Sequence, residues 1–394
     1  MHVLRAAMAV VIGAALAACG STGQGQGGAG TSSGTVAAAG QSVQFTVDGT
    51  TTYGTLDVPA HRAGQRLAAA LLMAGSGPTD RDGDDAVAGL EPHTLRLVAG
   101  VLGRMGIMTL RFDKYFSGQT GAGAFAGHPS SIDLAAFIKQ ADAAYDFLRA
   151  QPAADPHRML VAGHSEGGMY ALLVAESVTP RPAGLALIEP QDERFLSLVQ
   201  LQTDEQLDAM VTQGSIAAAT ARPNGEAVRQ AVADFRAGRP VVTDGMLPGV
   251  VNLLTPILLS GVNAAYVRSD DAVYPPGVAA RLPHGTRVLV TEGTADQNVP
   301  PSTITPLVRA LAAAGATGPG LRTLNGVNHL LHPPGAANDD QVLAPSVVTA
   351  LQSWAQPFSS LASRPPPASP SPFTAAPSLV APPSLLSPVA AAAL

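Results

Sequence analysis

The stretch that decides the fold is Arg-Met-Leu-Val-Ala-Gly-His-Ser-Glu-Gly-Gly at residues 158–168. Its first five residues form a short, largely apolar run that predicts a buried strand. The run ends in Gly-x-Ser-x-Gly around Ser165 and passes at once into a helical pattern over 169–177. A strand, a tight turn and a helix in this order are the setting of a nucleophile elbow, with the serine hydroxyl exposed at the carboxyl end of the strand. The stretch therefore indicates a serine nucleophile in an α/β protein.

A glycine-rich turn without chemistry is the competing interpretation, because the chain contains 41 glycines and the pentapeptide can arise by chance. An activated serine also needs a base, a group that orients the base, and donors for the oxyanion. Candidates for all three occur in suitable places along the chain, and they favour the catalytic interpretation.

The base and its orienting acid are expected in two loops that each follow a strand pattern. The pattern at 288–293 runs into Thr-Ala-Asp-Gln-Asn-Val-Pro, which places Asp296 before a helix. A shorter pattern at 321–324 runs into Asn-Gly-Val-Asn-His, which places His329 in a second loop. Open α/β sheets build their sites at the carboxyl ends of strands. We therefore expect His329 to take the Ser165 proton and Asp296 to hold the imidazole.

Two backbone N–H groups are expected to bind the oxyanion. One belongs to Glu166, directly after the nucleophile. The other should come from the glycine- and aspartate-rich loop that follows the apolar strand pattern at 67–73, and Ser76 is the predicted donor. Loss of one such donor typically lowers turnover by ~10²–10³-fold, so this loop is expected to matter for catalysis.

Other titratable residues have competing interpretations. Asp192 follows the strand pattern at 184–188 and is the alternative acid. His164 lies inside the elbow and is interpreted as a packing residue. His128 and His332 lack a position at a strand end, so neither is expected to be catalytic.

The aspartates of loop 80–85 have the composition of a cation site, but no His or Cys accompanies them in the loop. They are interpreted as hydrogen-bonding and ion-pairing groups, with cation binding as the alternative. Glu189 and Glu292 are interpreted as hydrogen-bonding groups at strand ends. No metal or other cofactor is expected.

Length, charge and cysteine count limit the class of protein. A chain of 394 residues suffices for one large domain or two medium ones. The net charge of −6 and the pI near 5.8 provide no basic patch, so no nucleic-acid partner is expected. Charged residues make up 13% and aromatic residues 4%, which favours a compact α/β body packed with small side chains. A single cysteine excludes an internal disulfide.

Residues 1–18 have the pattern of a secretory signal peptide. Arg5 is the one positive charge, and the apolar run 6–18 is too short to span a bilayer. The run ends in Leu-Ala-Ala-Cys, which resembles the lipobox of bacterial lipoproteins and implies cleavage before Cys19 and its lipidation. Ordinary secretion with an incidental cysteine is the alternative. Because the only cysteine falls here, we expect a lipid anchor in a membrane outside the cytoplasm.

The rest of the chain divides by composition. Residues 19–40 are rich in Gly, Ser and Thr and predict a flexible linker, whereas 357–394 are a Pro, Ser and Ala tail that cannot bury a core. Between them, 41–356 alternate strand and helix patterns and predict a doubly wound, mostly parallel α/β sheet. An antiparallel hairpin at 41–59 is expected at the sheet edge. The region 191–283 breaks the alternation and predicts a helical cap over the strand ends.

The predicted cap has helical patterns at 195–214 and 225–238 and more apolar side chains than a surface excursion needs. Placed between the strands that carry the site, these side chains are expected to wall an acyl pocket over Ser165. The alternative is that they only seal the cap against the sheet. The residues concerned are Phe195, Leu196, Leu198, Val199, Leu201 and the run 250–259.

Four motifs together carry a family resemblance. They are Gly-His-Ser-Glu-Gly, Gly-Ser-Gly-Pro-Thr-Asp-Arg-Asp-Gly, Leu-Arg-Phe-Asp-Lys and Gly-Thr-Ala-Asp-Gln-Asn-Val-Pro. They resemble bacterial α/β-hydrolases of the serine esterase and dienelactone-hydrolase-like group, over roughly residues 41–356. The Gly-Pro-Thr-Asp-Arg-Asp stretch discriminates best, because the whole superfamily shares the elbow. The resemblance implies an α/β-hydrolase fold and hydrolysis of carboxylic esters without a cofactor.

The chain departs from this group at two places. Members often carry His-Gly where this chain has Ala74-Gly75, which concerns the support of the oxyanion loop. They also carry Asp-Lys-Arg-Gly where residues 113–116 are Asp-Lys-Tyr-Phe, which concerns mainly the packing behind that loop. A serine in the elbow disfavours epoxide hydrolases and dehalogenases, which use Asp, and a thiol-dependent dienelactone hydrolase, which uses Cys.

Two classes of function follow from the sequence. The first is a membrane-tethered serine esterase that acts on a small-molecule ester outside the cytoplasm. The second is a lipoprotein that keeps the fold but binds its ligand without turnover. Peptidase or acyltransferase activity is a variant of the first class, because the same acyl-enzyme can react with water or with another nucleophile.

Overall fold

The computed structural model describes residues 34–360. The predicted signal peptide, Cys19, most of the predicted linker and the tail from residue 361 lie outside the described residues.

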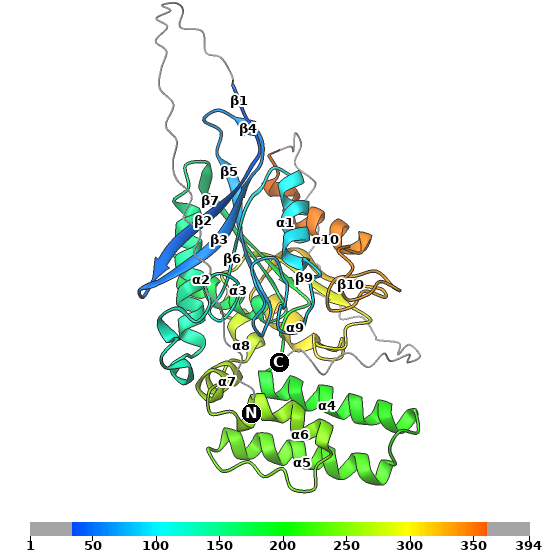
Figure 1. Ribbon diagram of the computed structural model, residues 1–394. Helices are drawn as coiled ribbons and strands as arrows, with labels where there is room; N and C mark the ends of the chain where they lie inside the picture. Colours follow the sequence, from blue (N-terminus) through cyan, green and yellow to red (C-terminus); the bar gives the residue numbers. More distant parts are fainter. Residues whose placement is uncertain (1–33, 361–394) are drawn as a thin grey trace, which may run out of the picture. The chain divides into compact units, whose positions relative to one another are not determined.

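The described residues form one main sheet of eight strands in the order β10-β9-β8-β7-β5-β6-β3-β2 (Figure 1). Strands from β10 to β6 run parallel, and the hairpin β2–β3 is antiparallel and occupies one edge, as predicted. A separate pair, β1 (Thr35–Val36) and β4 (His61–Arg62), is also antiparallel. The strands of the main sheet are β2 (Ala39–Val47), β3 (Thr50–Val58), β5 (Leu67–Met73), β6 (Met108–Phe112), β7 (Ala154–His164), β8 (Gly184–Ile188), β9 (Arg287–Gly293) and β10 (Thr317–Leu324).

Helices cover both faces of the sheet. Figure 1 shows α1 (Thr94–Arg104) and α10 (Pro345–Ala355) on one side, and α2 (Leu134–Arg149) and α3 (Glu166–Ser177) on the other. Helix α9 (Thr305–Ala313) packs on the α2 and α3 face.

The alternation of side chains along β5 accounts for this arrangement. Leu67, Leu71 and Met73 belong to the core under α2, α3 and α9, whereas Ala68 and Leu72 belong to the core under α1 and α10. A parallel strand covered on both faces is apolar throughout. The prediction of a doubly wound, mostly parallel α/β sheet is confirmed.

The segment between β8 and β9 is helical. Figure 1 shows α4, α5 and α6 as a layer apart from the helices that flank the sheet. Residues of α4 to α7 share a core of their own, whereas α8 packs with α9 against the sheet. The elements are α4 (Phe195–Thr212), α5 (Ala218–Arg236), α6 (Pro248–Leu254), a π-helical turn (Thr255–Leu259), α7 (Ala264–Asp271) and α8 (Pro275–Ala279).

Helix α5 differs from its sequence pattern, because it begins at Ala218 and contains Pro223, ahead of the helical pattern predicted from residue 225. Asn224 supports this part of the helix. Its amide donates to the Thr220 carbonyl at 2.9 Å, and its side-chain oxygen accepts from the Leu247 amide at 2.7 Å. Tertiary contacts therefore outweigh the local preference of Pro and Gly to interrupt a helix.

No single helix among residues 34–360 has the length and apolar character of a membrane span. One bent pair, Pro248–Leu259 with Ala264–Asp271, has them only in combination.

Candidate active site

Ser165 occupies a strained turn between β7 and α3, with φ 56° and ψ −124°. Side chains other than glycine seldom adopt positive φ, and such strain clusters at functional sites. This turn can form only because the glycines two residues before and after Ser165 have no side chains. A Cβ at Gly163 would lie 1.8 Å from the Gly167 carbonyl oxygen, and a Cβ at Gly167 would lie 2.4 Å from that of Met73. The turn therefore requires glycine at both positions.

Asp296 and His329 form a hydrogen-bonded pair at the ends of β9 and β10. His329 Nδ1 lies 2.7 Å from Asp296 Oδ2. The other carboxylate oxygen, Oδ1, accepts from the amides of Asn298 at 2.7 Å and Val299 at 2.9 Å. Because a carboxylate only accepts, Nδ1 must donate, and the neutral ring then presents Nε2 as an acceptor. The loops therefore prepare His329 to take a proton.

Ser165 and His329 both line a cavity of about 520 Å³, together with Ser76. Within residues 34–360, Ser165 Oγ makes no hydrogen bond to His329. Such bonds are often long in unliganded sites and shorten when substrate binds. The sequence pattern thus identified a nucleophile and a base that share one cavity and an acid that contacts the base, although their catalytic roles stay a prediction.

The amides predicted to bind the oxyanion belong to the residue after the nucleophile and to a loop that packs against the elbow. Glu166 is the first residue of α3, so its amide has no acceptor within the helix and lies at the positive end of the helix dipole. The Ser76 amide likewise makes no hydrogen bond within residues 34–360. Gly75 brings this loop against the elbow, because a Cβ there would lie 3.0 Å from Ser165 Cβ.

His164 does more than the packing that its sequence position suggested. Its Nε2 lies 2.7 Å from the His329 carbonyl oxygen, and the two rings lie 4.9 Å apart. A carbonyl only accepts, so Nε2 of His164 donates. Burial, and then the nearby His329, lowers the pKa of His164 to about 3, so the ring is neutral at ordinary pH. His164 therefore fixes the backbone of the base to the end of the nucleophile strand.

A cluster of buried acids surrounds Asp296, and the sequence did not reveal it as a cluster. Burial, and then the carboxyl of Asp192, raises the pKa of Glu292 to about 9. Burial, with Asp296 next, raises the pKa of Glu189 well above its usual range, and Glu189 Oε2 accepts from the Gly293 amide at 2.5 Å. Burial therefore disfavours the charged forms of Glu189 and Glu292 in this cluster.

The alternative acid, Asp192, does not contact the base. Its Oδ2 accepts from the Thr303 hydroxyl at 2.9 Å, and its side chain is fully buried. Burial raises the pKa of Asp192 to about 7. Asp296 is therefore the acid that the geometry favours.

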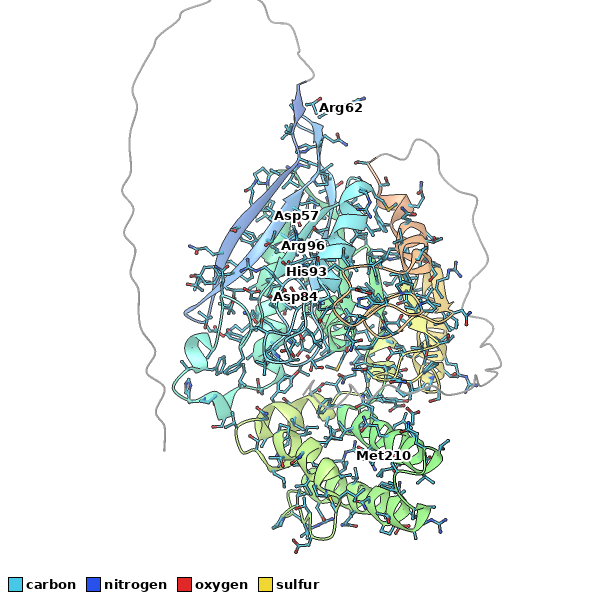
Figure 2. All side chains as sticks on the ribbon, turned by 45° about the vertical axis from the view of Figure 1, so that its right-hand side comes forward. Asp57, Arg62, Asp84, His93, Arg96 and Met210 are labelled. Carbon is cyan, nitrogen blue, oxygen red and sulfur yellow. The ribbon has the colours of Figure 1, made fainter. Side chains whose placement is uncertain are left out.

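The aspartates of loop 80–85 are engaged by neighbouring protein groups. Asp80 Oδ1 accepts from the amides of Asp82 and Asp84, at 2.8 and 3.1 Å. Asp84 also lies 2.6 Å from His93 Nδ1, and Figure 2 shows these two side chains next to each other. No group of three or more His, Cys, Asp or Glu within residues 34–360 is arranged to hold a metal ion. The interpretation as hydrogen-bonding groups agrees with these contacts.

A second cavity of about 300 Å³ adjoins the first, and both are lined by Ser76 and Phe195. Its walls are mostly apolar and aromatic, and its ionisable groups are Lys114, Tyr115, Glu166 and Tyr266. Of the apolar cap residues predicted to wall the site, Phe195 lines both cavities and Leu198 lines the first. Others instead stabilise the cap, since Leu196 belongs to its core.

No family model matches the chain, and no curated protein matches it. Its fold resembles that of solved structures. The esterase Est1E from Butyrivibrio proteoclasticus, in a structure with bound ferulic acid, is 15% identical with a TM-score of 0.50 over 80% of this chain and 98% of that one. The Pyrococcus furiosus esterase Pf2001 is 13% identical with a TM-score of 0.45 over 74% and 84%. A puromycin hydrolase is 16% identical with a TM-score of 0.48 over 82% and 39%. At these identities the likeness to Est1E establishes the α/β-hydrolase fold, and the reaction must be argued from the site itself.

Proposed function

We propose that this chain, built on an α/β-hydrolase fold, is a serine hydrolase that cleaves carboxylic esters through an acyl-enzyme. The observation that carries the proposal is the pairing of His329 with Asp296 on the cavity that also holds Ser165. The free amides of Ser76 and Glu166 beside the nucleophile add to it.

The chemistry follows from this arrangement. Ser165 Oγ attacks the ester carbonyl carbon while His329 Nε2 takes its proton, and Asp296 stabilises the resulting imidazolium. The carbonyl oxygen becomes an oxyanion, which the Ser76 and Glu166 amides stabilise. Collapse breaks the bond to the alcohol, which leaves with the proton from His329. Water, deprotonated by His329, then attacks the acyl-enzyme and releases the carboxylic acid and free Ser165.

The cavities favour short to medium acyl chains. The first, of about 520 Å³, is bounded by Phe195, Leu198 and Val199 of α4, and the second, of about 300 Å³, by Phe195 and Ile257 of the cap. A site walled by the cap accepts a soluble ester without a lipid interface. Turnover should therefore peak with short acyl esters and show no jump above the micellar threshold of the substrate.

A panel of chromogenic esters from acetate to palmitate tests the proposal. The panel also includes methyl ferulate, because the Est1E structure contains ferulic acid. The Ser165→Ala variant is the control, and a fluorophosphonate should label the wild-type protein on Ser165. An unlabelled protein that binds esters without turnover would instead be the binding lipoprotein. Labelling without ester turnover, but with cleavage of an amide or transfer to an added alcohol, would indicate a peptidase or an acyltransferase.

We also propose that the mature protein begins at Cys19 and is anchored by lipid to a membrane outside the cytoplasm. The support is the lipobox-like end of the apolar run and the presence of the only cysteine there. Intact mass of the mature protein should show acyl chains on Cys19, and Cys19→Ser should release the protein from membranes or leave it unprocessed. A mature mass without lipid would contradict the anchor.

A further inference from the structure

The chain uses lysine only twice among its 23 basic Lys and Arg residues, at Lys114 and Lys139. Lys139 is 61% exposed and pairs with Asp48 on the surface. Lys114 is only 6% exposed and lies beside the elbow. Because most basic residues of this chain are arginine, the presence of a lysine at this one buried position needs a physical explanation.

The contacts of Lys114 supply that reason. Its Nζ donates to the carbonyl oxygen of Gly75 and lies 3.4 Å from Glu166 Oε2. The Gly75 carbonyl belongs to the same peptide group as the Ser76 amide. Glu166 carries the second amide predicted to bind the oxyanion. One ammonium group thus contacts both elements that provide the predicted donors.

We propose that Lys114 is a positioning residue, which orients the Ser76 and Glu166 amides toward the oxyanion of the reacting ester. This inference rests on the proposed function and extends it to a residue that the sequence analysis gave no role. The bond to the Gly75 carbonyl fixes the plane of that peptide, and therefore the direction of the Ser76 N–H. It also withdraws electron density from the peptide, which strengthens its N–H as a donor.

A lysine suits this position better than an arginine. Its ammonium is a compact charge with three donors, whereas the guanidinium is a planar fork that needs a wider site. Here the partners are a single backbone carbonyl and one carboxylate oxygen, which do not form a bidentate pair.

The surroundings balance the buried charge. Burial lowers the pKa of Lys114, and Glu166 opposes that shift. Burial, and then Glu166, raises the pKa of Asp270 well above its usual range, which disfavours a second negative charge beside Glu166. The Tyr266 hydroxyl donates to Glu166 Oε1, and Tyr170 lies 2.7 Å from the Tyr266 hydroxyl. Lys114 and Glu166 thus form a buried ion pair whose carboxylate also accepts from Tyr266.

Lys114→Met is the direct test, because methionine keeps the unbranched stem and removes the ammonium. We expect kcat for a short ester to fall by about 10²-fold, as for loss of one oxyanion donor, with little change in KM. Affinity for a trifluoromethyl ketone, whose adduct with Ser165 bears an oxyanion, should fall by the same factor as kcat/KM. Lys139→Met is the matched control and should leave both quantities unchanged.

Because Lys114→Met leaves Glu166 buried without its cation, we expect that variant to lose stability. The double variant Lys114→Met/Glu166→Gln removes both charges and keeps an acceptor for Tyr266. It should recover most of the melting temperature but not kcat, since the Gly75 peptide still lacks its donor. Recovery of both would overturn the positioning role, and so would an unchanged ketone affinity in a folded Lys114 variant.

The wild-type protein offers a further measurement. Labelling lysine with ¹⁵N at Nζ gives two signals, and Lys139→Met identifies them. Binding of the ketone should shift the Lys114 signal and leave that of Lys139 in place, and an unshifted Lys114 signal would overturn the inference. Wild-type protein that neither hydrolyses esters nor reacts with a fluorophosphonate would refute the proposed function, and this role with it. If the wild-type protein is active and the Lys114→Met variant is equally active, only the role of Lys114 is refuted.

Discussion

Asp296→Asn is the substitution whose consequence the structure specifies most closely. Oδ1 of Asp296 accepts from the backbone amides of Asn298 and Val299, while Oδ2 accepts from His329 Nδ1. An asparagine must keep its oxygen toward the two amides, because its NH₂ group cannot accept from them. Its NH₂ then faces His329 Nδ1 and forces that nitrogen to accept. The ring proton moves to Nε2, and His329 can no longer take the proton of Ser165.

The expected loss is large. An inverted tautomer in a serine hydrolase costs about 10⁴-fold in kcat, which is ~5.5 kcal/mol of transition-state stabilisation. The side chain keeps its size and both amide contacts, so the melting temperature should change little. Initial rates with a short chromogenic ester, divided by the concentration of folded protein, measure the effect.

Asp192→Asn is the matched control, since Asp192 is equally buried but contacts Thr303 instead of the histidine. Its carboxyl has a pKa of about 7, so asparagine replaces a group that is already partly neutral at pH 7. We expect kcat near that of the wild type. Full activity in Asp296→Asn together with loss in Asp192→Asn would refute the assignment of the acid.

Three further outcomes are expected. Gly75→Ala places a Cβ 3.0 Å from that of Ser165 and should lower kcat by about 10-fold, because it displaces the nucleophile slightly. The control is Gly103→Ala in α1, where the new Cβ meets nothing within 4 Å and kcat should not change. Equal rates in both variants would contradict the close approach of Gly75 to Ser165. Burial raises the pKa of Glu292 from 4.5 to about 9, so between these pH values the folded chain holds a proton that the unfolded chain releases. The free energy of unfolding should therefore fall as the pH rises through this range, by up to ~1.4 kcal/mol per pH unit. Glu292→Gln should reduce that slope in denaturant titrations across pH, and an unchanged slope would argue against a neutral Glu292. Phe195→Ala joins the two cavities and should raise kcat/KM for octanoyl relative to acetyl esters; an unchanged ratio would place the acyl chain elsewhere.

The sequence predicted the fold class because its signals are local. The apolar run Leu67–Met73 and the alternation of strand and helix specify a sheet covered on both faces, and the structure confirms them. Because parallel strands end at one edge, residues just beyond β7, β9 and β10 could be expected to meet, and Asp296 and His329 do. The role of each in catalysis stays a prediction.

The remaining features depend on contacts that the sequence does not show. Lys114 reaches Gly75 and Glu166 only because β6 lies beside β5 in the sheet. The donation from His164 to the backbone of His329 joins residues that are 165 positions apart. Two features of the sequence point to Lys114, namely its place in the Leu-Arg-Phe-Asp-Lys motif and the presence of only two lysines in the chain, but neither reveals its contacts.

The order of the site along the chain also bears on how the protein is made. A ribosome completes the elbow first, and His329 emerges 165 residues after His164, which at ~5–20 residues per second is a delay of ~8–33 s. During that interval the nascent chain carries Ser165 without its predicted base. An arrested or truncated product that ends before residue 329 should therefore be inert toward esters, and activity should report that synthesis has reached the last strand of the sheet.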